Sequence, residues 1–160
     1  MFRTTALLVS VLVSTTVGAS EWWFIGIAAG ENTPFFFVDK ESLATSGKER
    51  IKFWEWRILS KDDQSPWGTY RTSKSLNTAD CQSKKLGVAR VIFYDSNGHV
   101  VDSVDNDNRE LIELAPDSIG EAKRKFVCSR GNSPEPGQTW AIDPEAYAER
   151  FLSSAWAIPN

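Results

Sequence analysis

Histidine and cysteine are scarce in this chain of 160 residues, which holds one His and two Cys. Since zinc sites need three or four protein ligands, His99 and two cysteines make a poor metal centre. The chain also lacks a GxSxG motif, a second histidine for a proton relay and a glycine-rich phosphate loop. We therefore expect no catalytic site, no metal and no cofactor, and we place His99 in an exposed hairpin. A hydrolase with an unusual carboxylate site is the weakest alternative.

A net positive charge and long apolar runs are also lacking. The formal net charge is −3, whereas a nucleic-acid-binding domain shows a basic field. Beyond the N-terminus, no apolar run is long enough for a helix to cross a bilayer. We expect neither nucleic-acid binding nor a membrane span after the N-terminal segment is removed.

The N-terminus has the pattern of a secretory signal peptide. Arg3 gives a short positive region, residues 6–17 are mostly apolar, and small residues stand at 17–19. Cleavage after Ala19 is predicted, and no cysteine follows to carry a lipid anchor. The mature protein is expected to be exported, either to the periplasm or to the medium, with surface exposure left open.

The two cysteines, Cys81 and Cys128, lie 47 positions apart. Export favours a disulfide, because oxidising compartments preserve the bond. An intramolecular pair closing this loop stabilises a fold by about 4 kcal/mol in the chain-entropy model. An intermolecular disulfide and a reduced thiol pair stay open as alternatives.

Short aromatic and β-branched runs predict strands at 21–28, 35–39, 50–59, 69–77, 85–95 and 100–104, with a shorter one at 110–115. Residues 61–68 are predicted as a polar loop, and Asn97-Gly98 as a hairpin turn. After Pro116, the period changes to that of a helix whose capping box is Ser118 and Glu121. We expect this helix to end before Cys128. Strands followed by a helix favour an α+β fold with an antiparallel sheet.

The tail begins with a linker rich in Pro and Gly and then returns to helical spacing. Asp143 is placed to cap a helix whose first residue is Pro144. The apolar face of this tail helix should dock on another surface. It is formed by Ala148, Phe151, Leu152, Ala155 and Trp156.

Five motifs follow one another along the chain: "FFFVDKESL", "FWEWRIL", "YRTSKSLNTADCQ", "ARVIFYDSNGHVV" and "LAPDSIGEAKRKFVC". In this order they resemble the surface-adhesin protein E-like family of Gram-negative bacteria. The resemblance implies a twisted antiparallel sheet of about six strands, with a helix across one face. It also implies that Cys81 and Cys128 tie this helix to the sheet.

The resemblance further implies a domain over residues 20–128, between a signal peptide (1–19) and an extension (129–160). The founding adhesin of the family is a dimer that binds host matrix and plasma proteins, so a homodimer is one possibility for this chain. The predicted function is that of an exported, non-enzymatic binding module with a host or periplasmic protein partner. The alternative is a periplasmic structural or assembly accessory that docks through its C-terminal helix.

Aromatic and basic side chains are candidates for the partner surface, with aromatics as anchors and basic residues for steering. Core packing of the tryptophans and simple solvation of the basic residues are the competing interpretations. The candidate residues are Trp22, Trp23, Trp67, Lys84, Lys85, Lys123, Arg124 and Lys125.

Overall fold

The computed structural model describes residues 19–66, 68–108 and 110–156. The predicted signal peptide therefore lies almost wholly outside the described residues. The strands are β1 (Trp22–Ile27), β2 (Pro34–Asp39), β3 (Ala44–Thr45), β4 (Arg50–Ser65), β5 (Gly68–Asp80), β6 (Lys85–Tyr94), β7 (Val100–Asp105), β8 (Ile112–Glu113) and β9 (Thr139–Trp140). The helices are η1 (Lys40–Ser42), α1 (Ile119–Cys128) and α2 (Pro144–Trp156).

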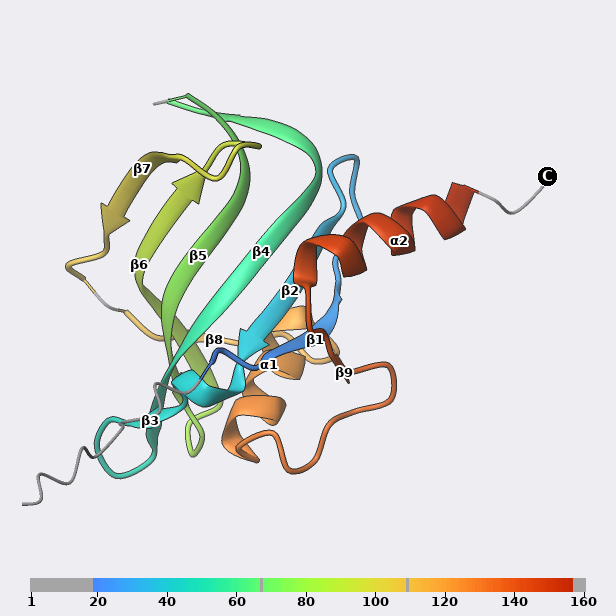
Figure 1. Cartoon of the computed structure of the whole chain (residues 1–160). Coiled ribbons are helices and arrows are strands. Elements are labelled where there is room, and N and C mark those ends of the chain that lie inside the picture. The colour runs from blue at the N-terminus through green and yellow to red at the C-terminus, as the bar shows by residue number, and fades with distance from the viewer. Residues whose placement is uncertain (1–18, 67, 109, 157–160) are drawn as a thin grey trace, which may run out of the picture.

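All the strands that the structure describes belong to one antiparallel sheet, in the order β7-β6-β5-β4-β2-β1-β9, with β3 added on β4 and β8 on β6 (Figure 1). The predicted α+β class is thus confirmed. The six predicted main strands correspond to β1, β2 and β4–β7. The other strands, β3, β8 and β9, have two residues each. Of these only β8 was expected, as the short strand predicted at 110–115.

The predicted loop at 61–68 is wrong, because β4 and β5 continue as a hairpin through most of it. After a bulge that follows Ile58, Asp63 pairs with Tyr70 and Ser65 with Gly68. Antiparallel pairing needs only backbone groups, and an exposed ribbon tolerates polar side chains. Polar composition was therefore a misleading guide to the end of the strand.

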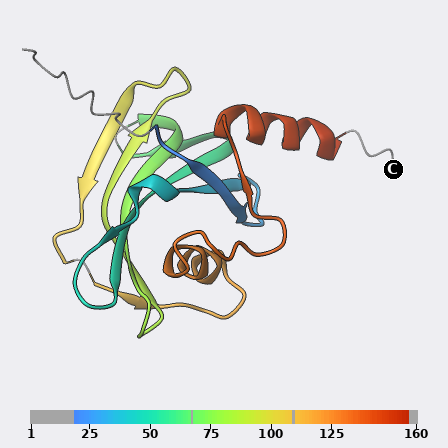
Figure 2. The same ribbon diagram turned by 60° about the horizontal axis from the view of Figure 1, so that its bottom comes forward.

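Side chains alternate between the two faces of the sheet and build two cores. One core contains Val38, Phe53, Ala79, Phe126 and Val127, all 0 % exposed, and lies under α1. The other core lies under α2 on the opposite face. Its buried members are Phe24, Phe35, Phe37, Ile58, Ala141 and Ala148. Figure 2 shows α1 in the hollow of the curved sheet and α2 outside it.

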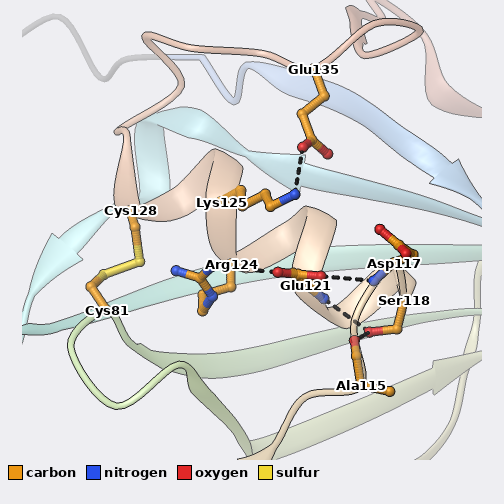
Figure 3. A network of polar contacts seen from close by, with 9 residues as sticks. All are labelled: Cys81, Ala115, Asp117, Ser118, Glu121, Arg124, Lys125, Cys128 and Glu135. Carbon is orange, nitrogen blue, oxygen red and sulfur yellow. Dashed lines mark hydrogen bonds and ion pairs between the residues drawn. A yellow bond between two sulfur atoms is a disulfide. The ribbon is translucent and has the colours of Figure 1, made fainter.

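Helix α1 begins with the predicted capping box. The Ser118 hydroxyl accepts from the backbone N–H of Glu121 (3.2 Å), and the Glu121 carboxylate accepts from the N–H of Asp117 (2.8 Å) (Figure 3). Cys81, which follows β5, forms a disulfide with Cys128, and their Cα atoms are 5.7 Å apart. The bond between helix and sheet is confirmed.

The expected end of α1 before Cys128 is wrong, since Cys128 is its last residue. The helix ends immediately afterwards, where Arg130 and Gly131 both have positive φ. The N–H of Gly131 donates to the carbonyl of Phe126 (2.9 Å), as in a helix C-terminal cap. The prediction rested on a helical wheel, on which Cys128 points away from the apolar face. In the structure Cys81 lies beside the last turn, so Cys128 reaches it from within the helix.

The C-terminal extension returns to the same domain. Trp140 of β9 pairs with Trp23 at the edge of the sheet, and Ala141 and Ala148 are buried in the core under α2. Of the predicted tail-helix face, Leu152 packs against that core, and Phe151 contacts Phe35 with 5.4 Å between ring centroids. The side chains of the other two members, Ala155 and Trp156, lie outside the described residues.

Candidate functional site

The adjacent tryptophans Trp22 and Trp23 lie on opposite faces of β1. Trp22 packs against Trp56 at 5.4 Å between ring centroids. Trp23 packs against Phe126 at 5.5 Å, and its indole N–H donates to Glu21 (2.7 Å). Both side chains are partly buried in internal contacts. The third predicted aromatic, Trp67, lies outside the described residues.

The predicted basic residues also separate. Lys84 is exposed in the turn before β6, where its φ is 57°. The next residue, Lys85, lies 3.7 Å from Glu113. On α1, Lys125 donates to Glu135 (2.9 Å), and this hydrogen bond raises the pKa of the lysine (Figure 3). Arg124 is only 12 % exposed and lies 4.0 Å from Glu121.

Lys123 points into the hollow of the sheet. Its ammonium donates to the carboxylate of Glu55 on β4 at 2.7 Å, and the two side chains are 13 % and 8 % exposed. The same ammonium lies 4.8 Å from the centroid of the Phe36 ring. A charge pair this deeply buried requires close mutual hydrogen bonding. The predicted surface set is therefore not one contiguous surface.

A cavity of about 430 Å³ opens beside this ion pair. Its walls come from β6, from the segment between β7 and α1, and from the first turns of α1. The apolar wall residues are Leu86, Val88, Ile112, Leu114 and Ile119. Two of them, Val88 and Ile112, are 38 % and 63 % exposed, so this cavity presents apolar surface to solvent.

Two glycines shape this cavity. A Cβ atom on Gly87 would lie 2.7 Å from the carbonyl oxygen of Glu110 and from a methyl group of Leu111. On Gly120, a Cβ atom would lie 2.9 Å from a Leu114 methyl group. The absence of side chains here lets the connecting segment approach both β6 and α1. Neither glycine has a positive φ, so close approach is the relevant property.

A second cavity, of about 230 Å³, shares Asn77, Val88 and Lys123 with the first and extends under the centre of the sheet. It is lined by Glu55 and Arg57 of β4 and by Ser75 and Ser73, which pair with them on β5. We call the 430 Å³ cavity the outer chamber and the 230 Å³ cavity the inner chamber. The two chambers are adjacent because they share three lining residues, and we refer to them together as the groove along α1.

Arg57 carries the unbalanced charge of the inner chamber. It donates to the Tyr70 hydroxyl (3.2 Å), which in turn donates to Asp63 (3.0 Å). Burial raises the pKa of Tyr70, against the opposing effect of the Arg57 charge. The Nε atom of Arg57 is buried without a hydrogen-bond partner, and no carboxylate of the described residues forms an ion pair with it. Sequence patterns gave no signal for this site, because its residues come from β2, β4, β5, β6 and α1, which are separate in the sequence.

Two further features were missed by the sequence interpretation. On the face opposite α1, the ammonium of Lys74 lies 4.3 Å from the Trp56 ring centroid and within 5.8 Å of those of Trp22 and Tyr94. At the β9 edge, Trp140 and Ile142 are 56 % and 83 % exposed. For Trp140 and Ile142, the available sequence signal was their position on either side of Ala141, since neighbouring residues in an extended segment point to opposite sides.

His99 lies where it was expected, in the β6–β7 hairpin, with its side chain 79 % exposed. Asp95 accepts hydrogen bonds from its backbone N–H (2.8 Å) and lies 3.2 Å from its Nδ1 atom. These contacts close the turn and explain the position of the residue. No helix among the described residues is long and apolar enough to cross a membrane.

Comparison with solved structures finds the same fold in protein E of Haemophilus influenzae. One structure has a TM-score of 0.50 at 20 % identity and covers 78 % of this chain and 96 % of that one. A second crystal form has a TM-score of 0.49 at 17 % identity, with coverages of 79 % and 100 %. Protein E from a non-typeable strain gives 0.47 at 16 % identity, with coverages of 92 % and 97 %. No curated protein matches the chain significantly.

The structure is a small α+β domain in which helix α1 is held on the antiparallel sheet by a disulfide. The chain belongs to the surface-adhesin protein E family, whose model matches residues 22–129. Membership of this adhesin family makes the protein a non-enzymatic one. The matched residues include both cysteines and end just after α1.

Proposed function

We propose that the protein is an exported binding module that attaches to a protein partner by surface complementarity. The family match over residues 22–129 carries this proposal. The partner classes are host matrix or plasma proteins and proteins of the periplasm. Export rests on the predicted signal peptide at residues 1–19. Sedimentation of the purified protein would test the homodimer that the family resemblance implies.

Trp140 and Ile142 are the proposed apolar anchors of the partner surface. They are 56 % and 83 % exposed at the β9 edge of the sheet, while Ala141 between them is buried. Exposed aromatic and aliphatic side chains at a sheet edge are typical of contact sites, since they lose water-exposed apolar area on binding. Lys84 and Lys125 are the predicted basic residues that remain exposed for steering. Trp22, Trp23, Lys85, Lys123 and Arg124 are each partly buried beside internal partners, so they leave the proposed contact set.

Binding to immobilised matrix and plasma proteins and to a periplasmic extract tests this surface. The double variant Trp140→Ser/Ile142→Ser should bind at least tenfold more weakly than the wild type, as hot-spot residues do. The control is Val100→Ser, because Val100 is 60 % exposed on the opposite edge strand, β7. Equal binding by the double variant and the wild type would show that Trp140 and Ile142 do not anchor the partner.

The second candidate, an assembly accessory that docks through α2, is favoured by Phe151, which is 38 % exposed. Figure 1 shows the end of α2 extending beyond the sheet. Removing the whole extension is a poor test, since Ala141 and Ala148 belong to a core. Phe151→Lys is cleaner. Loss of a periplasmic complex by this variant, with the Trp140/Ile142 surface intact, would support the accessory role, and its retention would argue against it.

A further inference from the structure

We propose that the groove along α1 is a binding site for a fatty carboxylate, with the aliphatic chain in the outer chamber and the carboxylate in the inner one. This site is independent of the proposed protein-partner surface, which lies at the β9 edge. The chambers, of about 430 and 230 Å³, share Asn77, Val88 and Lys123. A volume of roughly 300–1,000 Å³ is typical of small-molecule sites.

The outer chamber has the chemistry of an aliphatic-chain site. Leu86, Leu114 and Ile119 form walls that continue into the core, whereas Val88 and Ile112 remain 38 % and 63 % exposed. A bound chain would cover this apolar surface and displace the water against it, which is favourable at about 25 cal/mol per Å². The polar groups Asn106, Asn108 and Glu110 also line it. The Asn106 amide donates to the Val88 carbonyl of β6 (2.9 Å), and its side-chain oxygen accepts from the N–H of Asn108 (3.2 Å).

The inner chamber selects the sign of the head group. Glu55 and Lys123 neutralise one another at 2.7 Å, which leaves the Arg57 guanidinium as the uncompensated charge of that chamber. Its contact with Asp63 runs only through the Tyr70 hydroxyl. A carboxylate entering here would gain a charge-assisted hydrogen bond from a cation held among poorly solvated groups. The hydroxyls of Ser73 and Ser75 offer further donors.

The position of Lys123 couples the chambers. Its ammonium lies at their junction, 2.7 Å from Glu55 and 4.8 Å from the Phe36 ring centroid. The disulfide at Cys128 fixes the helix that carries it, so the groove is already formed before a ligand arrives. A preformed site reduces the ordering that binding would otherwise require.

Calorimetric titration of the purified protein with sodium dodecanoate, below its micelle-forming concentration, tests the proposal. We expect one molecule bound per chain. Acetate, which lacks the chain, and dodecyltrimethylammonium, which carries the opposite charge, should bind at least tenfold more weakly. Absence of dodecanoate binding, or equal binding of the cationic amphiphile, would overturn the assignment.

Two variants locate the site. Ile112→Glu places a carboxylate on the exposed wall and should weaken dodecanoate binding at least tenfold, whereas Val100→Glu, at a similarly exposed valine outside the groove, should leave it unchanged. Arg57→Gln should weaken it by about tenfold or more through loss of a charged hydrogen bond. Wild-type affinity in Ile112→Glu would overturn the chain site, and wild-type affinity in a folded Arg57→Gln would overturn the head-group site.

Discussion

Replacing Lys123 by Met would separate a buried ion pair while keeping most of the volume of the side chain. The change removes the ammonium that lies 2.7 Å from the Glu55 carboxylate, and both side chains are largely buried. Leaving one charge of such a pair without its partner destabilises a fold by about 3–5 kcal/mol. Loss of the contact with the Phe36 ring adds about 0.5–1 kcal/mol.

Urea denaturation followed by circular dichroism measures the free energy of unfolding of this variant. The double variant Lys123→Met/Glu55→Leu should lose less stability than Lys123→Met alone, because no buried charge then remains unpaired. Lys52→Met is the control, since Lys52 is exposed on the same strand as Glu55. A free energy of unfolding for Lys123→Met within about 0.5 kcal/mol of the wild-type value would refute the reasoning. A double variant less stable than Lys123→Met alone would also refute it.

Three further predictions concern the ends of α1 and the turn after β5. Ser118→Ala removes the hydroxyl that accepts from the Glu121 N–H and should destabilise the protein by about 1 kcal/mol in urea denaturation; no change would show that the cap is dispensable. Gly131→Ala places a Cβ at φ +69° and should lower the melting temperature, an effect that calorimetry would detect. The hydrogen bond from the N–H of Ser83 lowers the pKa of the Asp80 carboxyl in the folded protein. The carboxylate therefore stabilises the fold at pH values above its unfolded pKa, and this contribution disappears as the pH falls through the lower folded pKa. Asp80→Asn should therefore lose less stability than wild type between about pH 5 and pH 2, and identical pH profiles would contradict this.

Local patterns predicted much of the fold. The capping box at Ser118 and Glu121 and the Asn97-Gly98 turn each depend on residues close in sequence, and both occur as expected. The disulfide could also be predicted, because export favours disulfides and two cysteines allow only one intramolecular pairing. The extended β4–β5 hairpin was not, since its polar residues pair through the backbone and carry no apolar alternation.

The groove could not have been predicted from the sequence. The run of Lys123, Arg124 and Lys125 has the composition of a solvated helix face, yet α1 lies in a curved sheet that buries the first two of these side chains. Glu55, the partner of Lys123, is 68 positions away on β4. Unlike two cysteines in an exported chain, a lysine and a glutamate carry no signal in a single sequence that they pair with one another. The inward orientation of Lys123 therefore depends on the curvature of the sheet and not on the helix alone.

The covalent attachment of α1 to the sheet is the central feature of this account, and comparing the oxidised and reduced protein in urea denaturation tests it most directly. The Cys81–Cys128 bond closes a loop with a sequence separation of 47. The oxidised protein should be more stable by about 4 kcal/mol, with its two cysteines recovered in one disulfide-linked peptide pair by mass spectrometry. Equal stability of the two forms, or free thiols in the exported protein, would contradict the account.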